Sequence, residues 1–420
     1  MITIIISEKL SSLLKYVKGF IKWTVIALIV GGLGGVLGSF FHECIDYVTH
    51  LRTDKPWLLY MLPFGGLVIV FIYRLFKNRG SMDTNSVIKA VRENTKLPII
   101  MAPLIFVGTV ITHLFGGSAG REGAALQLGG SIGYNIGKLL RFGRDDLHII
   151  VMTGMSSVFS SMFGTPLTAA IFSLELISVG VIHYAALVPC LMASLTAYKI
   201  ALWFGISPVR FEGIIFGSFS TSVFARVIVL SLLVAALSVV FCVVSNKTEH
   251  LMKKLLPNGY LRAFVGGTII VLVSLALGTY DYNGAGMDIV ARAMSGDAAP
   301  EAFILKLLFT AVTISAGFKG GEIVPAFFVG STFGCTIAPL IGLDASLGAA
   351  IGFSALFCGV VNCPIASILL ALEVFGADGI LFFALACAVS YMMSGCYGIY
   401  KGQKIVYSKI SEEYIDINAK

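Results

Sequence analysis

Residues 116–133 read GGSAGREGAALQLGGSIG, a glycine-rich run that carries an arginine and a glutamate inside an otherwise apolar chain. The glycines permit tight backbone turns and leave backbone N–H groups uncovered, and AALQLGG continues as a helix. Such a helix start carries about half a positive charge and attracts anions through its free amides. This weak, distributed attraction suits an anion that must also be able to leave.

The composition of the chain places this run in a membrane. Hydrophobic residues make up 57% of the 420 residues and charged residues only 13%, far from the average of a soluble protein. A chain of this length has room for about ten or more segments of about 20 apolar residues, the length that spans a bilayer. We predict an all-α polytopic membrane protein, because a membrane barrel would show alternating strands instead of continuous apolar runs. The candidate spans are 23–42, 57–76, 98–115, 148–163, 166–178, 180–204, 225–245, 262–279, 302–318, 325–341, 346–361, 364–376 and 379–394.

Several spans are too short to cross alone, which is typical of discontinuous helices whose ends line a site inside the membrane. The order of signals in the first half also recurs in the second half. Gly154, Pro166 and Glu175 recur as Gly352, Pro364 and Glu373, and an offset of 200 residues aligns Glu122 with Glu322. Two such halves indicate a transporter or channel with a site at their interface. The halves are inverted if each has an odd number of segments, and the sequence leaves that number open.

The chain divides into five regions by composition. We expect a cationic amphipathic helix over 1–22, membrane repeats over 23–205 and 225–400, a linker at 206–224 and a short polar tail at 401–420. Basic residues cluster in the first region, in the tail and in two loops, which places both termini in the cytoplasm by the positive-inside rule. The net charge of +7 therefore reflects topology, and we expect no nucleic-acid partner.

Two further segments resemble anion-facing helix starts. In GFKGGEIVPAFFVG (317–330), two glycines precede a helix that Pro325 can enter in its first turn. In RGSMDTNSVIKAV (79–91), Ser81, Asp83 and Thr84 are plausible N-caps of a short helix. At the first start, the carboxylate of Glu122 can occupy the place of an anion and take up a proton, which makes it a tethered gate.

These segments together resemble the CLC family of chloride channels and anion/proton antiporters over most of the chain. The three anion-site motifs of the family, GSGIP, GREGP and GxFxP, are represented in order by GSMDT (80–84), GREGA (120–124) and GEIVP (321–325). FGTPLTAAIFSLE (163–175) is similar to the helix after the second motif, and Tyr400 matches a late tyrosine of the family. The resemblance implies a fold of two inverted repeats of broken, tilted helices and a homodimer in a cell membrane, most simply a bacterial inner membrane.

The resemblance also assigns roles by position. Glu122 corresponds to the external gating glutamate, Ser81 to the central serine and Tyr400 to the phenolic partner of the central anion. Backbone amides at Glu322 and Ile323 would supply the remaining contacts. The candidate gating and proton residues are Glu122 and Glu322, and the candidate anion-binding residues are Ser81, Met82, Tyr400, Glu322, Ile323, Arg121 and Gly123.

The departures from the family pattern leave alternatives open. GSMDT lacks the second glycine and the proline, so Met82 or Thr84 could face the ion instead of Ser81. Leu176 stands where proton-coupled members carry an internal glutamate, which places a proton route in doubt. Glu322 is then either a replacement proton carrier or a structural acceptor for loop amides. The GGE-x-x-P pattern is similar to the fluoride-exporting branch, whose members share these departures.

The expected function is transport of a small halide, with chloride preferred and fluoride second, by exchange with protons through a glutamate-gated pore. A passive voltage- or pH-gated chloride channel is the alternative. An intramembrane hydrolase is disfavoured, because His42-Glu43 lacks the second histidine of HExxH and no GxSxG occurs. We expect no metal or cofactor. Glu175 and Glu373 occupy equivalent places in both halves, which favours symmetric helix-end packing over a role in transport.

Overall fold

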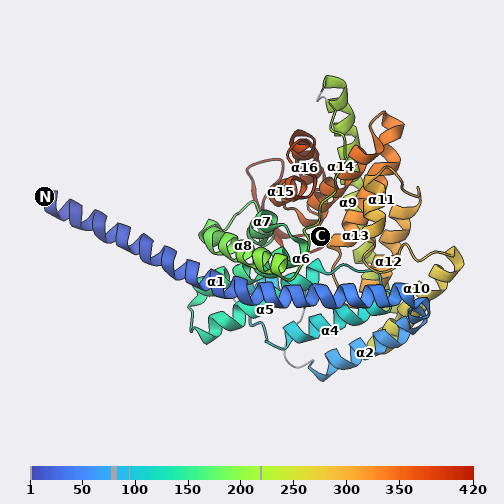
Figure 1. Ribbon diagram of the computed structural model, residues 1–420, viewed down its shortest axis with the longest axis horizontal. Coiled ribbons are helices and arrows are strands. Elements are labelled where there is room, and N and C mark those ends of the chain that lie inside the picture. Colours follow the sequence, from blue (N-terminus) through green and yellow to red (C-terminus); the bar gives the residue numbers. More distant parts are fainter. Residues whose placement is uncertain (1, 77–82, 94, 218–219) are drawn as a thin grey trace.

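The computed structural model describes residues 2–76, 83–93, 95–217 and 220–420, with side chains from residue 12 onward. Helices form one body, and the N-terminal part of the first helix projects from it (Figure 1). The first half contains α1 (Ile2–Asp54), α2 (Leu62–Leu75), α3 (Thr84–Glu93), α4 (Met101–Leu114), α5 (Glu122–Leu139), α6 (Arg144–Phe163), α7 (Pro166–Glu175) and α8 (Leu187–Trp203).

The second half repeats this order of helices. It contains α9 (Thr221–Leu255), α10 (Gly259–Leu277), α11 (Met287–Met294), α12 (Ala302–Ala316), α13 (Ile323–Ile337), α14 (Ala345–Val361), α15 (Pro364–Phe375) and α16 (Ile380–Met393). Short 3-10 turns occur at Pro56–Met61, Tyr184–Ala186 and Ala338–Ile341. Each predicted apolar span overlaps one of these helices, most of them within a few residues. The helices α1 and α9 extend well beyond the predicted spans 23–42 and 225–245, and the short amphipathic helix α11 was not predicted.

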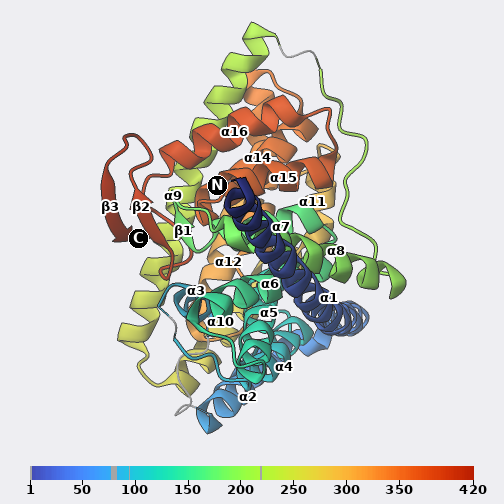
Figure 2. The ribbon, with the colours of Figure 1, turned by 90° about the vertical axis from the view of Figure 1, so that its left-hand side faces the viewer.

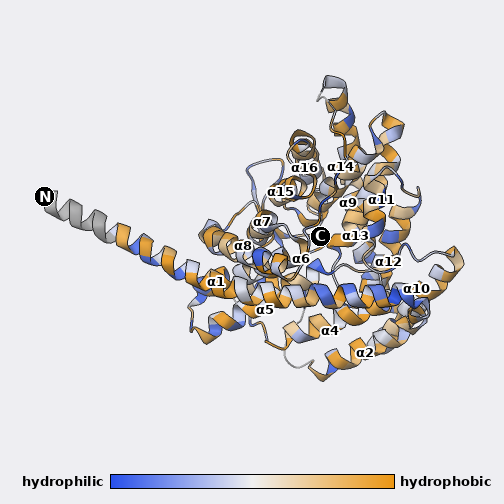
Figure 3. Ribbon diagram, in the orientation of Figure 1, coloured by the Kyte–Doolittle hydropathy of each residue, from blue (hydrophilic) through white to orange (hydrophobic). Residues whose placement is uncertain are grey.

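The helices expose apolar side chains as a membrane requires. Six helical segments of the described chain are long and apolar enough to cross a bilayer, while α4, α12, α14, α15 and α16 are shorter apolar helices. Figure 3 shows apolar residues along most helices. Large apolar side chains are exposed along α1, α2, α9 and α10, where water would penalise them and lipid would not.

Glycines allow the same close helix crossing in both halves. A Cβ on Gly129 would lie 2.2 Å from the Gly154 carbonyl oxygen, so α5 and α6 touch backbone to backbone. In the second half, a Cβ on Gly330 would lie 2.2 Å from the Gly352 carbonyl oxygen, where α13 meets α14. Small residues at a membrane helix crossing permit this approach, which van der Waals packing then stabilises.

The two halves meet at an antiparallel backbone bridge. Gly120 N–H donates to Gly321 O at 2.7 Å, and Gly321 N–H donates to Gly120 O at the same distance. Reciprocal antiparallel pairing of equivalent segments is what a local two-fold axis between the halves produces. The bridge also corrects the predicted alignment, because Gly120 pairs with Gly321 and the helices start at Glu122 and Ile323.

The true register therefore differs by one residue from the offset of 200. Arg121 and Glu322 are the N-cap residues of α5 and α13, so Glu322 is equivalent to Arg121. The equivalent of Glu122 is Ile323. The alignment of the two halves was wrong here because it matched Glu122 with Glu322 by residue type. The equivalence of the two helices is set instead by the backbone geometry at their first residues.

The chain is helical from Ile2 onward, and its tail contains two strands that the sequence did not indicate. Residues 2–22 continue without a break into α1 and form no helix of their own. In the tail, β2 (Lys404–Tyr407) pairs parallel with β1 (Ser178–Val179) and antiparallel with β3 (Tyr414–Asn418). Figure 2 shows this sheet at one edge of the helical body. The division of the chain into five regions stays a prediction.

Candidate functional site

Glu122 is the first residue of α5 and is almost completely buried, with 1% of its surface exposed. One carboxylate oxygen, Oε2, accepts a hydrogen bond from Arg121 N–H at 3.0 Å. Oε1 has no hydrogen-bond partner in the described part of the chain, and Arg121 Nε lies 3.7 Å from it. Gly120 leaves room for this carboxylate, because a Cβ there would lie 2.9 Å from Oε2. A buried carboxylate with an unbonded oxygen is costly and is retained where function needs it.

Glu122 opens into a cavity of about 600 Å³, which we call the Glu122 cavity. Its wall comes from the end of α1, the start of α5, the end of α6 and the loop between α10 and α11. Arg121 and His113 also line it, so the anion candidate Arg121 does face the same space as Glu122. Arg52 donates to His113 O at 2.9 Å and adds a second guanidinium to this wall.

A second cavity of about 540 Å³ shares no lining residue with the first. We call it the Tyr400 cavity, because Tyr400 lines it and is only 5% exposed. The Tyr400 hydroxyl has no hydrogen-bond partner among the residues described. A buried hydroxyl donor without an acceptor is costly, so this position is suited to an anion or a bound water.

Glu322 follows Gly321 of the glycine bridge and lines the Tyr400 cavity. Its carboxylate accepts no hydrogen bond from loop amides in the described ranges, which disfavours the structural-acceptor alternative. The Ser245 hydroxyl is the polar side chain beside this carboxylate. The two candidate proton residues therefore face different cavities.

In the described part of the chain, no N-cap side chain accepts from the first backbone amides of α5 and α13. Neither N-cap side chain, Arg121 or Glu322, caps its own helix. Ile323 is fully buried, and Gly123 packs against the opposite start, where a Cβ would lie 2.8 Å from Gly321 Cα. Only glycine at 123 lets the two positive helix ends approach each other this closely.

The third motif is described from Asp83 onward, so Ser81 and Met82 lie outside the described residues. Asp83 Oδ1 accepts from Ser86 N–H at 2.8 Å and caps α3. The Thr84 hydroxyl accepts from Gln127 Nε2 at 2.9 Å and reaches Gly123 O at 3.4 Å. Thr84 is engaged with these protein groups and also lines the Tyr400 cavity, so it stays a candidate ion-facing residue beside Ser81 and Met82.

Sequence reasoning missed Gln127, which lines the Tyr400 cavity one turn beyond Gly123. It is 5% exposed, and its Oε1 has no partner within the described part of the chain. The available signal was a lone amide in the apolar run AALQLGG, because a polar side chain in a buried membrane helix needs a partner.

Glu175 and Glu373 each accept hydrogen bonds from a helix start in the other half. Glu175 Oε2 accepts from Ala366 N–H at 2.8 Å at the start of α15. Glu373 accepts from Thr168 N–H at 2.9 Å and from its hydroxyl at 2.6 Å, at the start of α7. The predicted symmetric helix-end packing is confirmed. Leu176, next to Glu175, is completely buried and provides no proton-carrying group.

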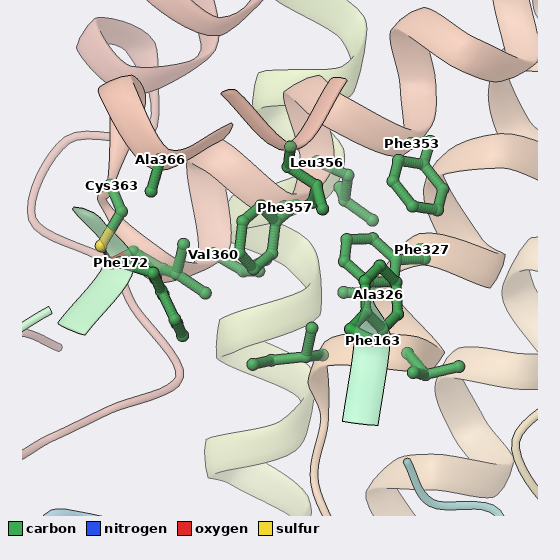
Figure 4. Close-up of a cluster of buried hydrophobic side chains, with 14 of the residues drawn as sticks. Phe163, Phe172, Ala326, Phe327, Phe353, Leu356, Phe357, Val360, Cys363 and Ala366 are labelled. Atoms are coloured by element: carbon green, nitrogen blue, oxygen red, sulfur yellow. Dashed lines mark hydrogen bonds between the residues drawn. The ribbon is translucent and has the colours of Figure 1, made fainter. Parts of the chain in front are cut away.

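An aromatic cluster seals the interface of the halves near these helix starts (Figure 4). Phe163 at the end of α6 lies 5.6 Å from Phe327 of α13 between ring centroids. Phe327 stacks on Phe353 at 4.0 Å, and Phe172 contacts Phe357 at 5.5 Å. These rings come from both halves and pack against one another at the interface.

Comparison with known proteins finds related proteins over most of the chain. The family described as "Voltage gated chloride channel" matches residues 64–395. A "Chloride/fluoride channel protein" of Pseudomonas syringae pv. tomato is 34% identical over 396 residues, covering 92% of this chain and 87% of that protein.

Solved structures match as well. The crystal structure of a CLC-type fluoride/proton antiporter superposes with a TM-score of 0.88 at 32% identity, over 91% of this chain and 97% of the other. A slow cyanobacterial Cl⁻/H⁺ antiporter matches with a TM-score of 0.77 at 21% identity, over 89% of this chain and 94% of the other, which supports the fold.

Proposed function

This chain belongs to the voltage-gated chloride channel family, and from that premise we propose that it exchanges fluoride for protons across the membrane. Membership makes it a polytopic anion-transporting membrane protein, and it argues against the hydrolase alternative. The finer assignments of ion, coupling and residue roles below are proposals.

The observation that carries the proposal is the placement of two acids. Glu122 opens to one cavity and Glu322 to the other, and the glycine bridge lies between them. A carboxylate can carry a proton and can also compete with an anion for free helix amides. One such group on each side allows protons to be taken up and released at separate faces while the anion moves along the amides.

We place fluoride ahead of chloride, which reverses the order expected from the motifs. The support is the 34% identical chloride/fluoride relative and the fluoride/proton antiporter at 32% identity. Fluoride is also the smallest halide and the strongest hydrogen-bond acceptor among them. A buried Tyr400 hydroxyl and free helix amides are donors that suit such an ion.

Within this proposal the gating and proton residues are Glu122 and Glu322, and Tyr400 holds the anion. Amides at Gly123 and Ile323 complete its coordination. Arg121 supports the charge of Glu122 from the cavity wall. Ser81, Met82 and Thr84 remain the three candidates of the third motif.

The proposed topology puts the Tyr400 cavity at the cytoplasmic face and the Glu122 cavity outside. Lys22 pairs with Asp146 at 2.5 Å, so the basic N-terminal segment and the basic loop before α6 share one face. That agrees with the positive-inside expectation for both. A homodimer is proposed from the resemblance alone.

A passive channel is the second candidate, because the Pseudomonas relative is named a channel. Reconstituted protein in liposomes, with fluoride and pH recorded together, separates the two. We expect an imposed fluoride gradient to drive protons against their own gradient, and an imposed pH gradient to drive fluoride. Fluoride flux without proton movement would instead indicate a passive channel. Chloride flux without fluoride flux would refute the assignment of fluoride as the substrate.

A further inference from the structure

Two cations in the Tyr400 cavity have no carboxylate partner. Lys319 follows the end of α12, Arg262 lies on α10, and both line this cavity. Neither forms an ion pair within the described ranges, and Arg262 Nε has no hydrogen-bond partner there. Lys319 is close enough to Asp83 and to Arg262 to interact electrostatically with both, and it is attracted by the carboxylate and repelled by the guanidinium.

Lys319 is held in position by contacts other than an ion pair. Its backbone N–H donates to Thr112 Oγ1 at 3.1 Å. The aliphatic stem passes over Gly108 of α4, where a Cβ would lie 2.8 Å from Lys319 Cγ. The ammonium then lies 4.2 Å from the ring centroid of Tyr73 on α2. The Tyr73 hydroxyl is buried and has no hydrogen-bond partner among the residues described.

The acids of the same cavity are mostly engaged elsewhere. Asp83 caps α3, and Glu249 is bonded to Lys253 at 2.5 Å and to Lys401 at 2.6 Å. Glu322 is not within ion-pair distance of Lys319 or Arg262. The two cations therefore leave a local positive charge on a partly buried wall, which is unfavourable unless an anion binds.

We propose that Lys319 and Arg262 form a binding site for the transported halide in the Tyr400 cavity, where the ion is held before it reaches Tyr400. The assignment of fluoride as that halide rests on the proposed function. The aromatic seat keeps the ammonium in place, and the guanidinium supplies a second donor from another helix. A weakly held ion at this point raises its local concentration beside the helix amides.

The test measures the fluoride concentration that half-saturates transport. It is measured separately on each face of the membrane, in right-side-out and inverted membrane vesicles. A protease-sensitive tag after Lys420 identifies the face that carries the tail. Lys319→Met and Arg262→Met should each raise half-saturating fluoride at that face roughly fivefold, the size of one partly hydrated charge contact. The maximal rate and the opposite face should be largely retained.

Two matched variants control for general effects of charge. Lys319→Arg should restore most of the affinity, because it keeps the charge. Lys254→Met removes an exposed lysine at the end of α9, outside the cavity, and should leave half-saturation unchanged. Unchanged half-saturation in both cavity variants, or an equal change at both faces, would overturn the site.

The outcomes also separate this site from the proposed function. If wild type moves no fluoride, the fluoride proposal fails, and the same variants are then measured with chloride. If the methionine variants do not fold, the wild-type salt dependence decides. Half-saturation should then rise more steeply with ionic strength at the tail face, because screening weakens the site, and equal slopes would refute it.

Discussion

The starts of α5 and α13 have the same backbone arrangement but different side chains. Both follow a glycine of the central bridge, and neither N-cap side chain caps its helix. In α5 the order is Arg121 then Glu122, whereas in α13 it is Glu322 then Ile323. The acid is thus shifted by one residue, and the two acids reach different cavities. The two halves share the helix ends but differ in where the acid is placed.

The pair Glu175 and Glu373 shows the opposite behaviour. These acids are equivalent by position, and each accepts amide hydrogen bonds from the helix start of the other half. Symmetric residues with satisfied hydrogen bonds stabilise the interface. Glu122 keeps an unbonded oxygen and has no equivalent acid. Asymmetry together with an unsatisfied buried atom therefore distinguishes the candidate transport residues from the structural ones.

Glu122→Gln, at the start of α5, should have the largest effect of three substitutions. The amide keeps the shape but neither takes up a proton nor bears charge, so proton flux should fall about 100-fold or more. Fluoride movement should continue, and the record of pH and fluoride in proteoliposomes measures both. Glu212→Gln changes an exposed acid outside both cavities and should alter neither flux. Wild-type proton coupling in the Glu122 variant would remove this residue from the proton route.

Glu322→Gln sharpens the comparison at the second start. We expect proton flux to fall about tenfold, less than the roughly 100-fold or more that is typical of losing a proton-transfer group, and fluoride flux to fall less still. The melting temperature should hardly change, because the carboxylate makes no hydrogen bond to loop amides among the described residues. A lower melting temperature with parallel loss of both fluxes would make Glu322 a structural residue and leave Glu122 as the titrating gate.

Tyr400→Phe should have the smallest effect of the three. Removing one neutral hydrogen-bond donor costs about 0.5–1.5 kcal/mol, or roughly 2- to 12-fold in the dissociation constant for fluoride, since the helix amides remain. Calorimetric titration of the purified protein measures this. Tyr414→Phe, on the exposed tail strand, is the matched control. Equal fluoride affinity in both variants and wild type would exclude Tyr400 from the anion site.

The sequence by itself determined the membrane class, nearly all helix positions and the presence of two halves. These depend on local signals: long apolar runs set the spans, and Pro166 and Pro364 start α7 and α15 because proline fits the first helical turn. Glu122 was singled out in the same way, since a lone acid in a glycine-rich helix start is conspicuous. The short amphipathic helix α11 was missed because it lacks an apolar run.

Tertiary structure alone decided the register of the halves and the groups that face each cavity. The bridge between Gly120 and Gly321 fixes the register through backbone contacts across two hundred residues, which a comparison of residue letters misread by one position. Lys319 in the loop after α12 and Arg262 on α10 line one cavity, and packing leaves the Tyr400 hydroxyl without a hydrogen-bond partner among the described residues. Local sequence acts over a few residues, whereas burial and hydrogen bonding at these positions depend on segments that meet only when the chain folds.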